Sequence, residues 1–335
     1  MRAIRLEKQG GPEELKLVDL PDPVAGPGEA VVRLHAAGLN HRELFIRQGL
    51  YPRIKLPCVL GSDGAGVVES VGAGVDAKWI GKRAVVVPFE GWGADPKVQG
   101  KDFFILGMPR QGTLAERIAV PVSMIAELPA HLSFEEGACF GVAGITAYRA
   151  VVTRGELKSG EHVLITGIGG GVATIALLFA KALGAQVSVT SSSDEKLARA
   201  RALGAVVAVS YKAKGWEKQL VGEAGSPPSL IIDGAVGDDF NALIAAAAPA
   251  ARIVIYGATR GRPKDFDVQR LFFKQLDVRG STMGNDAEFH AMLALIDRAR
   301  IKPVIDRVFP LAQVAEADKL LESGAQFGKI VVSCV

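Results

Sequence analysis

The sequence is poor in cysteine, in aromatic residues and in unbalanced charge, and each shortage excludes a class of protein. Its 335 residues include three cysteines, Cys58, Cys139 and Cys334, which lie far apart with no CxxC spacing. They therefore indicate neither a disulfide framework nor a cysteine-rich zinc site. Aromatic residues make up 6% of the chain, and the net charge of +3 is spread without a run of lysine or arginine. We therefore expect no nucleic-acid partner.

Long hydrophobic runs are also missing. The most apolar segment, residues 175–183, contains Lys181 and is too short to span a bilayer. The first four residues resemble the start of a strand rather than a signal peptide. We therefore expect a cytoplasmic protein with no membrane partner. The chain is 49% hydrophobic, which allows a large core, and its length favours two domains.

The strand pattern changes in character along the chain. Short alternating strands punctuated by glycine and proline predict a small β-barrel in the first 125 residues. They span residues 2–7, 15–18, 29–36, 66–71, 83–88 and 115–120. Strands that alternate with helices follow, at residues 163–166, 187–190, 206–210, 230–233, 252–256 and 277–280. This α/β alternation predicts a doubly wound parallel sheet.

We assign residues 126–285 to the domain with the parallel sheet. Residues 1–125 and 286–335 are assigned together to the barrel domain. The reason is that two helical patterns and a closing strand at 329–332 follow the last strand of the predicted parallel sheet. We expect this last portion of the chain to return and complete the barrel.

A glycine-rich turn follows the first strand of the predicted parallel sheet. Residues 162–166 form an apolar strand, residues 167–171 read GIGGG, and an apolar helix at 172–183 stops at Gly184 before the next strand. Glycines let the backbone approach a pyrophosphate, and the amides and dipole of the following helix receive its charge. This β-α-β unit therefore predicts a dinucleotide site.

The end of the second strand of that unit favours NADP(H) over NAD. An NAD site usually places an acidic residue there, about 20 residues past the glycines, to bind the ribose hydroxyls. The chain has Ser191, Ser192 and Ser193 instead, with Lys196 one helical turn further on. Hydroxyls and a lysine suit a 2′-phosphate. In the alternative, Ser193 caps a helix and Asp194 reaches the ribose.

Three segments together resemble the medium-chain dehydrogenase/reductase superfamily. They are AAGLN at 36–40, LGSDGAGVV at 60–68 and the GIGGGV turn, and the resemblance covers nearly the whole chain. Segments 47–51, 146–148 and 155–160 are similar to the zinc-free quinone oxidoreductase branch. The resemblance implies a GroES-like β-barrel catalytic domain and a Rossmann cofactor domain. It also implies hydride transfer in a cleft between the domains and a homodimer formed across sheet edges.

The resemblance also indicates where a metal would bind. The alcohol dehydrogenase branch has a cysteine at the position of Asn40, a histidine at that of Ser62 and a third ligand near Val142. Residues 88–112, which correspond to its structural zinc lobe, contain no cysteine. Asparagine, serine and valine cannot assemble a zinc site, so we predict no metal. A substitute set of His41, Asp63 and Cys139 is the alternative.

The cofactor residues follow from the resemblance, position by position. Gly167, Gly169, Gly170, Gly171 and Val172 match the pyrophosphate turn. Ser191, Ser192, Ser193 and Lys196 match the adenosine phosphate pocket, with Tyr211 at the adenosine end. Gly257, Ala258, Thr259, Met283 and Gly284 follow two strands on the nicotinamide side, where Thr146 either contacts the carboxamide or bonds its own backbone. We interpret Arg260 and Arg262 as solvated loop charges, with contact to the cofactor as the alternative.

The predicted activity is transfer of a hydride from NADPH to a quinone or an α,β-unsaturated carbonyl compound, without zinc. Asn40 and Tyr51 are the expected hydrogen-bond donors to the substrate oxygen, although a tyrosine in such a stretch more often anchors its loop. The long segment 89–113 is expected to shape substrate access. Two alternatives remain: a zinc-type alcohol dehydrogenase, and an NADPH-binding protein with a non-catalytic regulatory role.

Overall fold

A computed structural model describes all residues from Met1 to Val335 and divides into two compact units. Unit 1 comprises Met1–Ala143 and Asn285–Val335, and unit 2 comprises Gly144–Gly284. Unit 1 thus extends beyond residue 125, the boundary expected from the strand pattern. The reason is that β10 (Ile125–Glu127) pairs with β6 (Arg83–Val86), and α2 (Phe134–Gly137) packs against the strands of unit 1.

Unit 1 is built on a seven-stranded sheet in the order β10-β6-β5-β3-β18-β17, with β9 also paired to β3. Its long central strands are β3 (Glu29–Gly38) and β5 (Asp63–Val71), which pair antiparallel. The closing strand β18 (Lys329–Ser333) pairs antiparallel with β3, so the C-terminal portion returns to this unit. The other members are β9 (Arg117–Pro121) and β17 (Ile305–Pro310).

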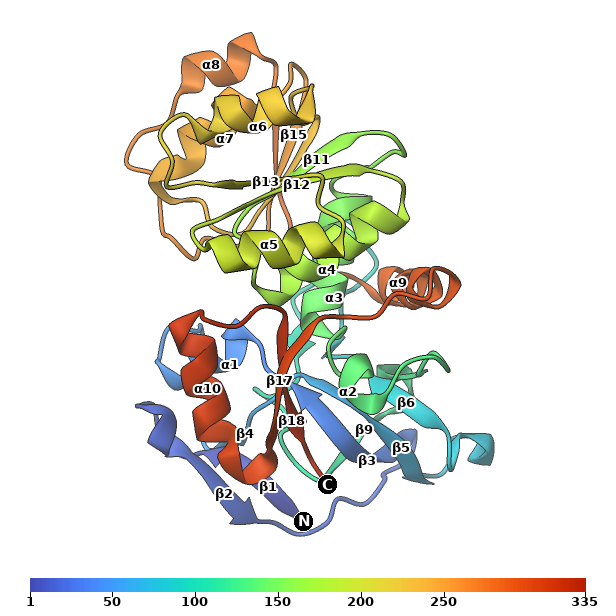
Figure 1. The fold of residues 1–335 in the computed structure, drawn as a ribbon. Helices are drawn as coiled ribbons and strands as arrows, with labels where there is room; N and C mark the ends of the chain where they lie inside the picture. Colours follow the sequence, from blue (N-terminus) through green and yellow to red (C-terminus); the bar gives the residue numbers. More distant parts are fainter. The chain divides into compact units, whose positions relative to one another are not determined.

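A smaller three-stranded sheet, in the order β2-β1-β4, contains the first two strands of the chain. It consists of β1 (Arg2–Leu6), β2 (Leu15–Asp19) and β4 (Cys58–Val59), and a separate hairpin pairs β7 (Phe89–Glu90) with β8 (Phe104–Ile105). The helices of unit 1 besides α2 are α1 (His41–Arg47), α9 (Asp286–Arg298) and α10 (Val314–Ser323). Helix α10 lies beside α1 (Figure 1).

Unit 2 holds a six-stranded sheet in the order β13-β12-β11-β14-β15-β16, and every pair in it is parallel. The strands are β11 (His162–Ile165), β12 (Gln186–Ser191), β13 (Val207–Ser210), β14 (Leu230–Asp233), β15 (Arg252–Ile255) and β16 (Asp277–Gly280). The strand order reverses at β11, as in a Rossmann fold, which confirms the predicted doubly wound sheet.

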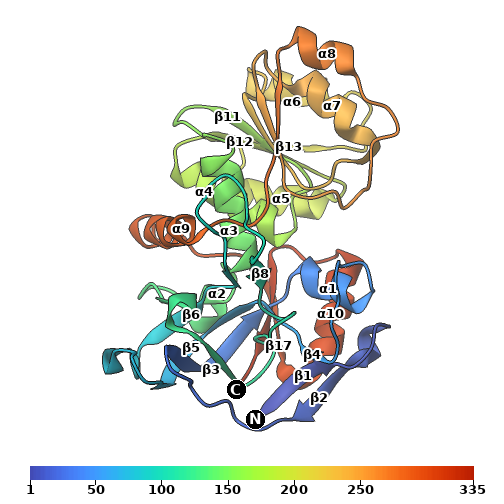
Figure 2. The same ribbon diagram turned by 180° about the vertical axis from the view of Figure 1, so that it is seen from behind.

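Helices cover both faces of the unit 2 sheet. Figures 1 and 2 show α4 (Gly171–Ala182) and α5 (Asp194–Leu203) on one face and α6 (Trp216–Ala224) and α7 (Phe240–Ala246) on the other. Side chains of α6 and α7 pack with buried sheet residues in one hydrophobic cluster. Helix α3 (Val142–Tyr148) precedes β11, and α8 (Val268–Phe273) precedes β16. None of the helices is both long enough and apolar enough to cross a membrane.

Candidate functional site

The glycine-rich turn of unit 2 has the backbone geometry of a phosphate site. Gly167 and Gly169 have φ angles of +59° and +141°, which side chains other than glycine rarely adopt. Gly170 then serves as the N-cap of the twelve-residue helix α4. A Cβ added at Gly169 would lie 2.8 Å from Cδ and 3.1 Å from Nζ of Lys196, so the lysine ammonium lies close to this turn. The turn therefore combines helix amides with a positive charge.

The three serines gather where β12 ends. Ser193 caps α5, because its Oγ accepts a hydrogen bond from the backbone N of Lys196 at 3.3 Å. Ser191 is buried, and its Oγ accepts from the backbone N of Ser193 at 3.2 Å, whereas Ser192 is exposed. The capping role considered for Ser193 is thus present, and it leaves the hydroxyl of Ser192 facing solvent.

Tyr211 lies next to the serines, directly after β13. Its backbone N donates to the carbonyl of Ser191 at 3.1 Å. The guanidinium of Arg260 lies 5.1 Å from the centre of the Tyr211 ring and forms an ion pair with Asp239. Arg260 is therefore held at the ring by two contacts, rather than being only a solvated loop charge as we had expected from the sequence.

The residues expected on the nicotinamide side fall into two groups within unit 2. Gly257, Ala258 and Thr259 follow β15, and the backbone N of Thr259 donates to the carbonyl of Gly234 at 3.2 Å. Met283, which precedes Gly284, has a φ angle of +43°, and its Sδ lies 3.9 Å from Oγ1 of Thr146. The structure thus places Thr146 beside Met283.

The glycine pattern gave no indication of one polar residue in this region, Asp233. Asp233 ends β14, is almost fully buried, and accepts a hydrogen bond from the hydroxyl of Thr166. It also accepts from the backbone N of Ala235 at 3.1 Å and of Val236 at 3.0 Å. Asp233 therefore fixes the backbone that leaves the sheet beside the strand of the glycine-rich turn.

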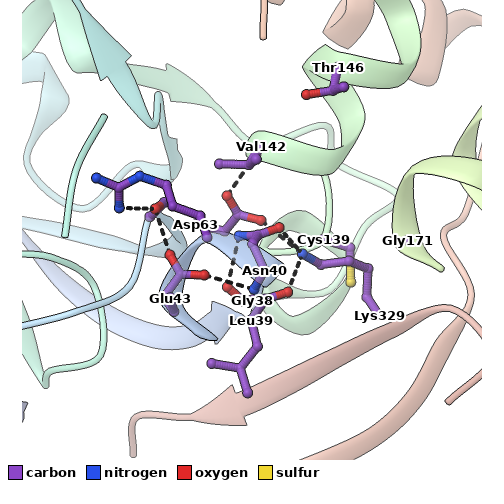
Figure 3. A network of polar contacts seen from close by, with 12 residues as sticks. Gly38, Leu39, Asn40, Glu43, Asp63, Cys139, Val142, Thr146, Gly171 and Lys329 are labelled. Carbon is purple, nitrogen blue, oxygen red and sulfur yellow. Dashed lines mark hydrogen bonds and ion pairs between the residues drawn. The ribbon is translucent and has the colours of Figure 1, made fainter. Parts of the chain in front are cut away.

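A second group of polar side chains lies in unit 1, around a buried lysine that opens β18. Lys329 is 3% exposed, and Figure 3 shows its ammonium between Asn40 and Asp63. Its Nζ donates to Oδ1 of Asn40 at 2.6 Å and to the carbonyl of Leu39 at 2.7 Å, and it pairs with Oδ2 of Asp63 at 3.1 Å. An ammonium group has three hydrogens, so these three contacts satisfy it completely.

Asp63 is held from two sides. The side chain is fully buried, and its second oxygen, Oδ1, accepts from the backbone N of Val142 at 2.7 Å. A Cβ at Gly141 would lie 2.2 Å from that oxygen, so only glycine allows the chain to approach so closely. The carboxylate therefore has a hydrogen-bond donor on each oxygen, which compensates for its removal from water.

A second buried carboxylate joins this group through α1. Glu43 accepts from the backbone N of Asn40 at 2.8 Å, which is the return bond of a capping box, and from the hydroxyl of Ser62 at 2.7 Å. Burial raises the pKa of Glu43 above its ordinary value. Arg42 in turn donates to Oγ of Ser62 at 3.3 Å. We call Asn40, Arg42, Glu43, Ser62, Asp63 and Lys329 the polar network.

Arg42 connects the polar network with Tyr51 and with the long loop. Its guanidinium carbon lies 4.9 Å from the centre of the Tyr51 ring. The same guanidinium donates to the carbonyls of Ile105, Leu106 and Met108 at 3.2, 2.8 and 2.6 Å. The structure thus brings Asn40 and Tyr51 into one region. The contact with Arg42 is the kind of anchoring contact that the loop interpretation of Tyr51 had required.

Sequence patterns had given no role to Arg42, Glu43 or Lys329. The spacing of Asn40 and Glu43 is a helix-start signal, because an Asn followed three residues later by Glu forms a capping box. Lys329 offers a weaker signal: it is a charged residue directly before three apolar strand residues, Ile330 to Val332. Its burial depends on partners that lie 266 and 289 residues away along the chain.

The residues at the family's zinc positions do not fit a zinc ion. Asn40, Ser62 and Val142 lack the thiolate, imidazole and carboxylate ligands that zinc requires, and an ammonium group already contacts Asn40. No group of three or more His, Cys, Asp or Glu side chains is arranged to hold a metal. In the alternative set, burial raises the pKa of the Cys139 thiol to about 12, and Asp63 is engaged by Lys329.

Comparison with known proteins identifies related domains in both units. Residues 26–130 match the alcohol dehydrogenase GroES-like domain, and residues 171–298 match the zinc-binding dehydrogenase family. The zinc-type alcohol dehydrogenase-like protein YogA of Leptosphaeria maculans is 41% identical, over 96% of this chain and 94% of its own. The quinone oxidoreductase of Pongo abelii is 30% identical, over 99% and 97%.

Solved structures show the same fold. The crystal structure of an NAD-dependent alcohol dehydrogenase superposes with a TM-score of 0.94 at 37% identity, over 99% of both chains. The 2-octenoyl-CoA carboxylase reductase CinF, in complex with NADP and 2-octenoyl-CoA, superposes with a TM-score of 0.89 at 26% identity, over 99% of this chain and 87% of its own. The chain therefore belongs to the medium-chain dehydrogenase/reductase superfamily, and it is an oxidoreductase by its kinship with quinone oxidoreductases and alcohol dehydrogenases.

Proposed function

We propose that this protein is a zinc-independent, NADPH-dependent reductase of quinones or α,β-unsaturated carbonyl compounds. The observation that carries the proposal is that Asn40, Ser62 and Val142 stand where a zinc site would need metal ligands, and that the Asn40 side chain accepts a hydrogen bond from Lys329 instead. Without a metal, hydrogen-bond donors must polarise the substrate oxygen, and this favours acceptors that take a hydride readily. The similarity to a quinone oxidoreductase supports this choice.

The cofactor proposed is NADPH. The glycine-rich turn and the amides of α4 suit the pyrophosphate, and Ser192 with Lys196 suits the 2′-phosphate, because charge-assisted hydrogen bonds to phosphate are strong. The NADP complex of CinF supports NADPH, whereas the name of the similar NAD-dependent alcohol dehydrogenase favours NAD. Serine rather than an acid at the end of β12 supports NADPH.

The proposed chemistry needs a donor at the carbonyl oxygen. NADPH, when bound, would supply a hydride to the β-carbon of an enone, and the carbonyl oxygen would then gain negative charge. Asn40 Nδ2 donates to that oxygen as its negative charge develops, and solvent then supplies the proton to the α-carbon. With a quinone, one hydride and one solvent proton would give the hydroquinone. Tyr51 is proposed as a second donor.

A cofactor and substrate screen tests the proposal. The purified protein should oxidise NADPH faster than NADH in the presence of quinones or enones, contain no stoichiometric zinc and keep its activity in a chelator. Oxidation of alcohols with NAD, lost on chelation, would instead establish the zinc-type alcohol dehydrogenase. Tight NADPH binding with no turnover of any acceptor would favour the regulatory alternative.

A further inference from the structure

Arg42 is a buried arginine, 7% exposed, whose hydrogen bonds all go to neutral oxygens. Its Nη1 donates to Oγ of Ser62 and to the carbonyl of Leu106. Its Nη2 donates to the carbonyls of Ile105 and Met108. The four terminal hydrogens thus have four acceptors, and only Nε is left without a partner. The planar fork of a guanidinium can serve four acceptors at once, whereas the three hydrogens of a lysine cannot.

These contacts help to place residues 105–108. Three carbonyls of this short segment face the same cation, while the side chains of Leu106 and Met108 are buried, at 1% and 4% exposure. Carbonyl oxygens gathered at one point repel one another unless a cation or a donor lies between them. Removal of Arg42 would take a donor from each of the three carbonyls. We therefore expect the segment to shift or loosen without the guanidinium.

The same guanidinium lies against one face of the Tyr51 ring. Its central carbon is 4.9 Å from the ring centre, within the range of a cation–π contact. Tyr51 is partly exposed and follows α1 in a stretch outside the helices and strands. The contact with Arg42 is the one polar contact that its side chain makes. A ring held in this way can present only its other face, and its hydroxyl, to a ligand.

Arg42 is also fixed relative to the proposed substrate donor. It lies two residues after Asn40, in the first turn of α1. Ser62, which accepts from Arg42, donates to Glu43, and Glu43 accepts from the backbone N of Asn40. Tyr51 and residues 105–108 are therefore held by a side chain whose own position is tied to that of Asn40.

We propose that Arg42 is a positioning residue that makes the protein selective for acceptors with a flat ring, because it holds the Tyr51 ring and residues 105–108 in place in the region of Asn40. A flat acceptor gains from an aromatic side chain that is already oriented to stack on it, and a small open-chain enone gains less. This inference rests on the proposed function and narrows it to quinones.

Initial-rate kinetics with saturating NADPH would compare menadione, a flat quinone, with methyl vinyl ketone, a small open-chain enone. The wild type should have the higher kcat/KM with menadione. Arg42→Met should raise KM for menadione about tenfold, because ordering one loose side chain on binding costs up to about that factor. KM for methyl vinyl ketone and kcat for both acceptors should change by about threefold at most, since the loss weakens the binding of the flat ring.

Three variants separate this role from structural support. Arg42→Lys keeps the charge but not the fork, so it should resemble Arg42→Met, and it is the test if Arg42→Met does not fold. Tyr51→Leu should raise KM for menadione to a similar extent, and Arg42→Met should have a smaller effect in that background than alone. Arg83→Met is the control and should match the wild type. Arg83 makes the same two kinds of contact elsewhere in unit 1, 4.8 Å from the centre of the Phe134 ring and with the carbonyl of Leu132.

Fluorine NMR tests the position of the ring without activity. Protein labelled with fluorotyrosine should give one signal for each of its four tyrosines, and the signal missing from Tyr51→Leu belongs to Tyr51. Arg42→Met should shift that signal, because the ring loses the cation on its face, and should leave the other three in place. Arg83→Met should leave all the signals in place.

An unmoved Tyr51 signal in folded Arg42→Met, equal rises in KM for the two acceptors, or fully multiplicative effects of Arg42 and Tyr51 would overturn the proposal. So would a wild type that prefers methyl vinyl ketone, or an unchanged KM for menadione in Tyr51→Leu, which needs no Arg42 variant to fold. A wild-type protein that reduces no acceptor would defeat the proposed function, and the fluorine spectra would then still decide whether Arg42 holds the ring.

Discussion

We expect the 2′-phosphate, which NADPH carries and NADH lacks, to be recognised by single side chains of the dinucleotide site in unit 2. Lys196 lies close enough to Gly169 that a Cβ there would collide with its side chain. Ser193 is engaged as a helix cap, so its hydroxyl is less available than that of Ser192. The charge of Lys196 is therefore the strongest feature of the site that favours a 2′-phosphate.

Lys196→Ala should raise KM for NADPH about tenfold and KM for NADH by a smaller factor, because Lys196 also lies beside the pyrophosphate turn. A hydrogen bond to a charged group contributes about 1.5–3 kcal/mol, and 1.4 kcal/mol corresponds to a factor of ten. Initial-rate kinetics with each cofactor would measure both constants. Lys218→Ala, at an exposed position of α6, is the matched control and should change neither. An equal loss for NADPH and NADH would contradict the assignment of Lys196 to the 2′-phosphate.

A buried histidine makes the stability of unit 2 depend on pH. His162 is 5% exposed, its Nδ1 donates to the carbonyl of Ser226 at 2.8 Å, and its Nε2 accepts from the hydroxyl of Ser188 at 2.7 Å. Both ring nitrogens are thus used in the neutral form. Burial lowers the pKa of His162 below its ordinary value of 6.5.

The free energy of unfolding should therefore fall as the pH drops below 6.5. In that range the unfolded chain, with its ordinary histidine pKa, binds more protons than the folded chain, so acid favours unfolding. Urea denaturation at pH 7.5 and 5.5 would measure the loss. His162→Gln should reduce the difference between the two pH values, whereas His290→Gln, at an exposed position of α9, should retain it. An unchanged difference in His162→Gln would assign the pH dependence to other groups.

Among the elements, α1 is one of the short helices. It has seven residues, too few to be stable alone, so its position depends on the contacts at its start. Glu43 satisfies the backbone N of Asn40 and the hydroxyl of Ser62, and both groups are buried. The helix start therefore holds the proposed substrate donor in place.

Glu43→Ala should lower the free energy of unfolding by about 2 kcal/mol, because the buried backbone N of Asn40 loses its partner at a cost of about 1–3 kcal/mol, whereas the hydroxyl of Ser62 keeps the carbonyl of Leu106 as an acceptor. Denaturant unfolding at neutral pH is the measurement. Glu316→Ala is the control: Glu316 is an exposed residue of α10, and such surface changes are usually within about 0.5 kcal/mol. A loss in Glu43→Ala as small as that of the control would show that water replaces the carboxylate at the helix start.

The regular elements were predictable because their patterns are local. All six strands of the unit 2 sheet were anticipated, since most of them are short apolar runs between helices. The strands missed in unit 1 include β4, β7 and β8, which have two residues each and are too short for an alternating pattern to appear. Their pairing depends on neighbours that are distant in the sequence.

The glycine-rich turn was equally visible, because glycine is required there by the local backbone. The polar network was not. Asp63 and Lys329 are 266 residues apart, and only the antiparallel register of β3 with β5 and β18 brings them together. The residues next to Lys329 in the sequence do not indicate that its ammonium is buried. This burial could be recognised only in the folded chain.

At the scale of the whole molecule, the two edges of the unit 2 sheet differ. The edge strand β13 is largely buried. The opposite edge strand, β16, is mostly exposed, and Val278 on it is 42% exposed. Phe272 and Phe273 of α8 are also exposed, at 54% and 78%. An open strand edge accompanied by apolar side chains is a surface on which another chain can pair.

The resemblance to the family implies a homodimer across sheet edges, and we expect it to form by pairing of β16 with β16 of a second copy. A two-fold axis places the same patch on both partners. Val278→Lys together with Phe273→Glu should therefore convert the protein to a monomer, because charge on a strand edge and in an apolar contact opposes pairing. Light scattering after gel filtration would report the mass, with Val206→Lys, an exposed apolar position beside β13, as the control that stays dimeric. A wild-type protein with the mass of one chain would show that no dimer forms. A dimer that survives the paired substitution would show that the two copies meet at another surface.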